Sequence, residues 1–143
     1  MNVDSDRILV RLNFIEEKLQ QLKRFERISL DDYLGNSDQR LIIERLLELI
    51  IQSAIDINKH IVRKGLRLKF PSESKESFIL LFQNNILSKE LAQNLADSAG
   101  LRNVLAHQYL EINDTIVYES IAKALTQYPR YLQQITTYLD SLE

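Results

Sequence analysis

Arg102, Asn103, His107 and Tyr109 fall within eight consecutive residues and carry side chains that can act on a phosphate. Arginine holds a permanent charge and a planar set of donors that fit phosphate oxygens. Histidine titrates near neutral pH and can give or take a proton. On a helix each residue advances by about 100°, so Arg102 and Tyr109 would share one edge of a polar face, and Asn103 and His107 the other. The spacing therefore predicts a groove suited to phosphate chemistry.

The same four residues also have an ordinary explanation as polar positions on a helix surface. However, the face that carries them has few charges, and Leu110 lies in its middle. A solvated helix face usually carries more charge than this. We therefore expect this face to line a groove or a subunit contact, with Leu101, Val104 and Leu105 on the opposite side against the core.

The composition favours helices that could carry such a face. Only three Gly and two Pro occur among 143 residues, whereas Leu, Ile, Glu, Gln, Lys and Arg are abundant. This composition is typical of long helices rather than of strands joined by tight turns. No repeat or long linker divides the chain. We predict one all-α domain over residues 1–143, a helical bundle of four to five helices.

The composition also limits the chemistry. Without Cys there is no thiol nucleophile, disulfide or thiolate metal site, and with two His residues we expect neither a metal centre nor a cofactor. The net charge of −2 means that any nucleic-acid contact must come from a local basic patch. The sequence has neither the pattern of a signal peptide nor an apolar run of about 18 residues, so a cytoplasmic protein is expected.

The first helix is expected from about Asp4 to Glu26, and a linker from Ile28 to Asp38 follows it. Apolar residues at spacings of three and four define one stripe along this helix. The members of this stripe are Ile8, Leu12, Ile15, Leu19 and Leu22.

The second helix is expected from about Gln39 to Lys64, after a cap at Ser37 or Asp38, and it stops at Gly65. Its apolar face is wide, which is typical of a central helix or of an oligomer contact. The residues on this face are Leu41, Ile42, Leu46, Leu49, Ile50, Ile57 and Ile61.

A third helix is expected from a cap at Ser72 to about Phe82, and a fourth from a cap at Ser88 to about Leu110. The fourth helix carries the reactive residues, and Gly100 could bend it just before them.

Asn113 or Asp114 can cap the last helix, which Pro129 is expected to kink or break.

The reactive residues resemble a known signature. Arg102, His107 and Tyr109, with the polar Asn103 after the arginine, match the Arg-x4-His-x-Tyr motif of the HepT-like toxins, a branch of the HEPN superfamily. The resemblance extends over most of the chain. It includes Asp56-Ile57-Asn58-Lys59-His60, Phe78-Ile79-Leu80-Leu81-Phe82 followed by Ile86-Leu87, and Gly100-Leu101.

This resemblance implies a metal-independent endoribonuclease, the toxin of a type VII-like toxin–antitoxin pair, with a bundle that dimerises around the motif helix. RNA's 2′-hydroxyl attacks the adjacent phosphorus when a group takes its proton and another stabilises the phosphorane charge. We assign proton transfer to His107 and charge stabilisation to Arg102, while Asn103 would position His107 or the phosphate. Because one chain supplies one histidine, a two-fold dimer would complete a composite site.

In this family the motif tyrosine is adenylylated by a partner nucleotidyltransferase of the MNT type, and the resemblance implies this role for Tyr109. The attached AMP would add charge and bulk beside Arg102 and block RNA. A half-buried helix tyrosine is the ordinary alternative for this position.

Between residues 59 and 69 the chain has five cations and no acidic residue. Arg63, Lys64 and Arg67 could contact an RNA backbone, although cations at a helix end also stabilise the helix dipole without any ligand. Asp56 and His60, four residues apart, could form a hydrogen bond that raises the pKa of His60.

Two other functions fit parts of the sequence. The first is a noncatalytic helical subunit that binds a nucleotide or presents a substrate to a nucleotidyltransferase. Related helical proteins of this kind often lack the Arg and His pair, so the pair favours the enzyme. The second is a simple dimerisation bundle, for which the motif face would be only a subunit contact.

Overall fold

The first helix forms along the predicted apolar stripe. The computed structural model describes residues 3–107 and 109–143, and in it α1 spans Ser5–Lys23. The Asp4 side chain accepts a hydrogen bond from the Arg7 N–H and caps the helix. All five predicted stripe residues are buried, at most 5% exposed. The prediction of this helix is confirmed, with an end three residues earlier than expected.

The segment predicted as a linker contains a short helix, α2, over Leu30–Gly35. Ser29 caps it by accepting from the Asp32 N–H, and two acidic residues lie in its first turn, where the helix dipole favours them. Asn36 caps the next helix by accepting from the Gln39 N–H, so the predicted caps Ser37 and Asp38 are wrong.

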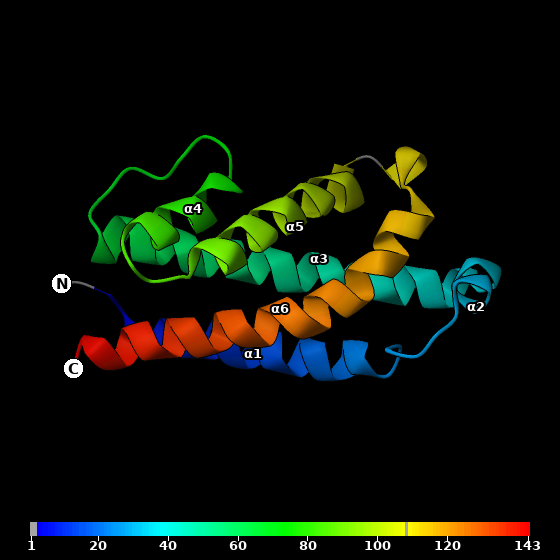
Figure 1. The fold of residues 1–143 in the computed structure, drawn as a ribbon, viewed down its shortest axis with the longest axis horizontal. Helices are drawn as coiled ribbons and strands as arrows, with labels where there is room; N and C mark the ends of the chain where they lie inside the picture. The colour runs from blue at the N-terminus through cyan, green and yellow to red at the C-terminus, as the bar shows by residue number, and fades with distance from the viewer. Residues whose placement is uncertain (1–2, 108) are drawn as a thin grey trace.

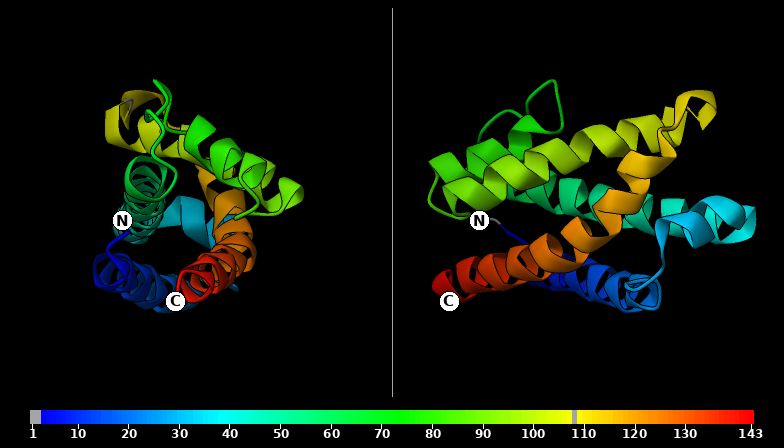
Figure 2. Two further views of the ribbon diagram at one scale, coloured as in Figure 1. Left: turned by 90° about the vertical axis from the view of Figure 1, so that its left-hand side faces the viewer. Right: turned by 45° about the vertical axis from the view of Figure 1, so that its right-hand side comes forward.

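The central helix, α3, spans Ser37–His60 and continues into a π-helix, η1, over Ile61–Gly65. It contacts all five other α-helices, which confirms the prediction of a central helix. Figures 1 and 2 show α1 on one side of α3, with α4 and α5 on the other. Two residues of its predicted face, Leu41 and Ile42, are 64% and 46% exposed. They precede the buried stripe, which begins at Ile43 and repeats every three to four residues.

The helix α4 spans Glu76–Gln83. It starts later than predicted, and no side chain caps it, so Ser72 does not have the capping role that its residue type suggested.

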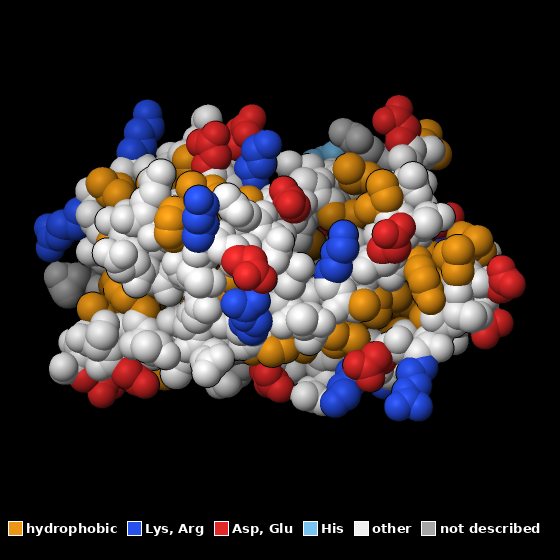
Figure 3. Space-filling view, in the orientation of Figure 1, with side chains coloured by type: hydrophobic (Ala, Val, Ile, Leu, Met, Phe, Trp, Pro, Cys, Tyr) orange, Lys and Arg blue, Asp and Glu red, His pale blue; other side chains and the backbone are white. Residues whose placement is uncertain are grey.

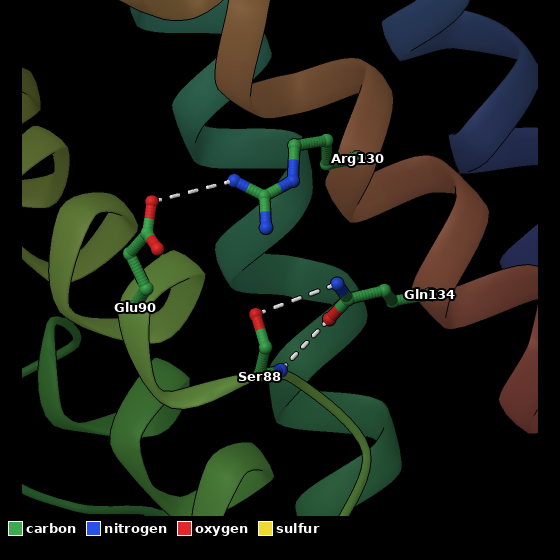
Figure 4. A network of polar contacts seen from close by, with 4 residues as sticks. All are labelled: Ser88, Glu90, Arg130 and Gln134. Atoms are coloured by element: carbon green, nitrogen blue, oxygen red, sulfur yellow. Dashed lines mark hydrogen bonds and ion pairs between the residues drawn. The ribbon is translucent and has the colours of Figure 1, made fainter.

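Polar contacts with α6 fix the start of the motif helix, α5, which spans Lys89–His107. The Ser88 carbonyl accepts the Ala92 N–H, as expected of a cap residue. The Ser88 N–H donates to Gln134 Oε1 at 2.9 Å, and Arg130 Nη1 lies 3.8 Å from Glu90 Oε1 (Figure 4). These contacts set the position of α5 along α6.

The last helix, α6, spans Asp114–Ser141 after a short 3₁₀ helix, η2, over Tyr109–Glu111. Asn113 caps it, as predicted, by accepting from the N–H groups of residues 115 and 116. Pro129 does not break α6, which continues as one curved helix (Figure 1). Proline removes a single backbone N–H, and the buried Tyr128 and Tyr131 on either side hold the helix against the core.

The described residues form six α-helices and no strand, so the predicted all-α bundle is confirmed. The count exceeds the predicted four to five because of α2. No helix among the described residues has both the length and the apolar character required to cross a bilayer.

A buried polar network joins α3, α4 and α6 near the C-terminal end of α3. The Tyr131 hydroxyl donates to Asn58 Oδ1 at 2.6 Å and lies 3.1 Å from the Ala54 carbonyl oxygen. Asn58 Nδ2 donates to Ser77 Oγ at 3.0 Å, and Ser77 Oγ donates to the Ser74 carbonyl at 2.7 Å. The side chains of Asn58 and Ser77 are the buried polar ones of the described core, and each has partners.

Replacing Tyr131 with Phe removes the donor to Asn58 Oδ1 and leaves a buried acceptor unpaired. We expect the free energy of unfolding in urea to fall by about 1–3 kcal/mol. Tyr118→Phe is the matched control, because that hydroxyl donates to the Ile28 carbonyl at 2.8 Å from a half-buried position that water can reach. The control should lose less than about 1 kcal/mol. Equal losses in the two variants would contradict a special role for the buried network.

Candidate functional site

The reactive residues lie on the less buried half of α5. The first half is anchored in the core by Leu91, Ala92, Leu95 and Ala99. Beyond these, Leu101 and Leu105 are only partly buried, although both pack against the core on the predicted side. Arg102, Asn103 and His107 therefore belong to the last two turns of a helix whose base is firmly packed.

Arg102 has one side-chain donor without an acceptor among the described residues. Its side chain is half-buried, and its Nε is buried without a hydrogen-bond acceptor among the described residues. Its Nη1 donates to Asn103 Oδ1 at 3.3 Å. A buried donor without an acceptor costs free energy, which a change of side-chain position that brings the guanidinium to an anion would recover.

His107 is exposed and is the last residue of α5. Asn103 is also exposed, and its side chain pairs with Arg102. Helical spacing had placed Asn103 on the edge of His107, so the hydrogen bond to Arg102 is a contact that the spacing did not predict. The arrangement supplies a held guanidinium and an accessible imidazole on one helix.

Tyr109 lies in η2 rather than on α5, because the motif helix ends at His107 and not near Leu110. Its predicted alignment with Arg102 assumed an unbroken helix, and that assumption is wrong. The placement of the Tyr109 side chain lies outside the described residues. Leu110, next to it, also lies in η2, so its predicted position on the face of α5 is wrong for the same reason, although its side chain is 87% exposed.

A groove of about 440 Å³ lies between α5 and α6, and Arg102 is not among its lining residues. Leu101 and Val104 of α5 line it, together with residues of α6 and η2, and Leu47 and Ile51 of α3 form its floor. Figure 3 shows hydrophobic side chains over this part of the surface. Because Arg102 and His107 do not line it, this groove is not the candidate site.

The basic residues predicted to contact RNA lie at the other end of the bundle. α3 and α5 run in opposite directions, so η1, with Arg63 and Lys64, is far from the C-terminal end of α5 (Figure 1). Arg67 follows η1 with a positive φ of 56° and is exposed. Within one chain the structure does not bring these cations to Arg102 and His107.

The predicted bond between Asp56 and His60 is replaced by two other contacts. Asp56 Oδ1 accepts from Gln52 Nε2 at 2.9 Å, and His60 Nε2 accepts from the Asp4 N–H at 2.9 Å. Burial, followed by the charge of Arg7, lowers the pKa of His60. The expectation of a raised pKa is therefore wrong, because burial and the nearby cations outweigh the opposite effect of the Asp4 carboxylate.

Two residues that lie near His60 were not identified from the sequence. Arg7 and Arg11, on α1, line the same pocket as His60, Arg63 and Lys64. Their spacing of four residues puts both on one face of α1, and this spacing could have indicated that they lie together. Among the described residues, no group of three or more His, Asp or Glu side chains is arranged to hold a metal ion.

Comparison with known proteins gives consistent matches. A family model described as "Ribonuclease HepT-like" matches residues 15–135. The chain is 49% identical over 142 residues to the tRNA nuclease HepT of Aphanizomenon flos-aquae. This match covers 99% of this chain and 96% of that protein. It is 33% identical over 116 residues to the mRNA nuclease HepT of Shewanella oneidensis. This match covers 80% of this chain and 86% of that protein.

The fold is similar to that of a solved toxin. The tri-AMPylated HEPN toxin of Shewanella oneidensis, in complex with an MNT antitoxin, superimposes with a TM-score of 0.82 at 27% identity. The match covers 96% of this chain and 99% of that chain.

The lowered pKa of His60 predicts a pH effect on stability. Below about pH 6.5 an unfolded chain protonates this histidine, whereas the folded chain binds the proton less readily, so stability should fall as the pH falls from 7 to 5. His60→Gln keeps an acceptor for the Asp4 N–H but does not titrate. Urea unfolding at several pH values should show a weaker pH dependence for the variant than for the native chain, and identical dependences would contradict the assignment.

Proposed function

This chain belongs to the family of HepT-like ribonucleases, and from that premise we propose that it is an endoribonuclease toxin whose active site is centred on Arg102 and His107. The observation that supports this site best is the half-buried Arg102, whose Nε has no acceptor among the described residues, on the same two helical turns as the exposed His107. A guanidinium so held is suited to the phosphate of an RNA backbone.

The proposed reaction is an attack of the RNA 2′-hydroxyl on the adjacent phosphorus. A base takes the proton of the 2′-hydroxyl, the new P–O bond forms, and the bond to the 5′-oxygen breaks as that oxygen gains a proton. The products are a 2′,3′-cyclic phosphate and a 5′-hydroxyl. His107 transfers protons, and Arg102 stabilises the extra negative charge on the phosphoryl oxygens. Asn103 orients the guanidinium through its hydrogen bond. This chemistry requires no metal ion.

We further propose that two chains form a two-fold dimer around the ends of their α5 helices. The reaction uses a base and an acid, whereas each chain has a single histidine in the motif. A two-fold axis near His107 would supply a second Arg102–His107 pair. Leu110, 87% exposed beside the motif, is an apolar residue that such a contact would cover.

The relatives suggest the substrate and the regulator. The relative with the higher identity is a tRNA nuclease, so tRNA is our first candidate substrate and mRNA the second. The Shewanella toxin carries AMP groups in its complex with an MNT antitoxin. We propose the same kind of control here, with a nucleotidyltransferase antitoxin that attaches AMP to Tyr109. AMP at this position would place negative charge near Arg102 and compete with RNA.

The alternative, a noncatalytic subunit that binds nucleotides or presents a substrate, uses the same helical fold but has no need for Arg102 and His107 together. The presence of both Arg102 and His107 favours the enzyme. Arg67 stays a predicted RNA backbone contact, outside the site.

Replacement of His107 with Ala should abolish RNA cleavage without unfolding the protein. We expect the cleavage rate of tRNA to fall by about 10²–10⁴-fold, because proton transfer by a positioned side chain contributes roughly that factor. Lys23→Ala is the matched control, since Lys23 is likewise exposed and the last residue of its helix. It should cleave at the native rate. Cleavage by the purified His107→Ala protein at the native rate would refute the catalytic role.

Co-expression with an MNT-type nucleotidyltransferase tests Tyr109. Intact mass spectrometry should find the native chain heavier by whole AMP units and the Tyr109→Phe variant without them. Tyr118→Phe, a change of the same kind on α6, should keep the modification. An AMP increment that survives in Tyr109→Phe rejects this residue as the acceptor.

A further inference from the structure

A cluster of cations surrounds a shallow pocket at the end of the bundle far from the motif. We call it the distal basic cluster and define it as Arg7, Arg11, Lys59, Arg63 and Lys64. The pocket has a volume of about 360 Å³ and is also lined by Asp56 and His60. Its residues come from α1, α3 and η1, so the cluster exists only in the folded chain.

The cluster has an excess of positive charge, since five cations and one carboxylate line the pocket. In the described part of the chain, none of the five cations lies within 4.0 Å of a carboxylate oxygen, whereas Lys18, Arg45, Lys75 and Arg130 each do. Asp56, the one carboxylate of the pocket, is hydrogen-bonded to Gln52. Five like charges on adjacent helices repel one another, and an external anion would remove that cost.

The backbone around the cluster is held in place before any ligand binds. The bond from the Asp4 N–H to His60 Nε2 ties the start of α1 to the end of α3. Gly65, which ends η1, is closely approached by two side chains: a Cβ there would lie 2.6 Å from the Tyr138 hydroxyl oxygen and 2.8 Å from Val3 Cγ2, so both would have to shift. The π-helix is itself a costly element that is frequent at functional sites.

The cations that carry the cluster favour phosphate groups. Three of the five are arginines, whose planar donors match phosphate oxygens, and Arg63 and Lys64 are exposed on η1. With its Nε2 occupied by the Asp4 N–H, a neutral His60 has its proton on Nδ1 and adds one more donor.

We propose that the distal basic cluster binds the phosphate backbone of the RNA substrate away from the bond that is cut. This inference rests on the proposed ribonuclease function and extends it to the choice of substrate. The 19 residues of α5 span about 28 Å between the two ends of the bundle. An RNA that contacts both regions of one chain must therefore bridge a distance of this order.

The test compares two triple variants with the same change in charge. Arg11→Gln, Arg63→Gln and Lys64→Gln together remove three cations of the cluster. Lys18→Gln, Arg45→Gln and Lys75→Gln remove three cations that lie near carboxylates elsewhere. Both sets are made in the His107→Ala protein, and binding of a full-length tRNA is measured between about 50 and 200 mM salt, the range over which phosphate contacts weaken strongly.

We expect the cluster variant to bind tRNA at least about tenfold more weakly and the slope of log K against log salt to become shallower by roughly 0.7–0.9 per lost contact. The control should keep nearly the native affinity and slope. In the active protein, the cluster variant should lower kcat/KM through KM and leave kcat unchanged, because binding remote from the reaction acts equally on substrate and transition state.

Three results would overturn the inference: an unchanged affinity and salt slope, an equal loss in both triple variants, or normal RNA binding with loss of the nucleotidyltransferase complex. The last result would assign the cluster to an acidic protein surface. If the native protein cleaves RNA and the cluster variant binds RNA normally, only this inference is rejected. If the native protein binds tRNA through the cluster but does not cleave it, only the proposed ribonuclease function is rejected.

Discussion

The position of every functional residue depends on the burial of α3 among the five other helices. This helix must satisfy its polar side chains inside the core, and Asn58 does so by accepting from Tyr131 and donating to Ser77. Because these partners belong to α6 and α4, the hydrogen bonds fix both helices relative to α3. Apolar packing alone tolerates small shifts of a helix along its neighbour, whereas a directional bond in a low-dielectric core does not. The network therefore specifies one arrangement of the bundle.

Packing along α5 is uneven, and this bears on its chemistry. Its first half is fixed by buried apolar residues and by the contacts of Ser88 and Glu90 with α6, while its last turns lie partly exposed over a groove. Sites that must accept a ligand or a partner are generally drawn from the less stable parts of a fold. The site at Arg102 and His107 follows this rule. The first half of α5 is firmly packed, whereas its last turns are partly exposed and can be reached by an RNA or a second chain.

Much of the fold was predictable because the apolar period of a helix is a strong signal. The stripe of α1 and the cap at Asn113 could be read from residue types alone. Errors arose where several residues of similar type compete. Asn36 caps α3 although Ser37 and Asp38 are equally suitable, and the acidic residues of α2 suggested a loop because they also favour turns. The continuity of α6 through Pro129 depends on tertiary packing, which no local pattern contains.

The candidate site was predictable only in part, for the same reason. Arg102 and His107 stand out by type and spacing, but the contact between Asn103 and Arg102 is a choice of rotamer. The end of α5 at His107 moves Tyr109 off the helix, and the sequence has no glycine or proline there to indicate it. The joining of Arg7 and Arg11 with Arg63 requires knowledge of which helices are neighbours. Local sequence carries the chemistry of single residues, while the grouping of distant residues comes from the fold.

The opposite directions of α3 and α5 place the motif and the distal basic cluster at different ends of the bundle. Under the proposed function, substitutions at one end can alter which RNA is held without touching the residues that cut it. Evolution can then change the target and the cutting machinery independently. That separation gives a physical route by which one small helical fold can serve both the tRNA nuclease and the mRNA nuclease that this chain resembles.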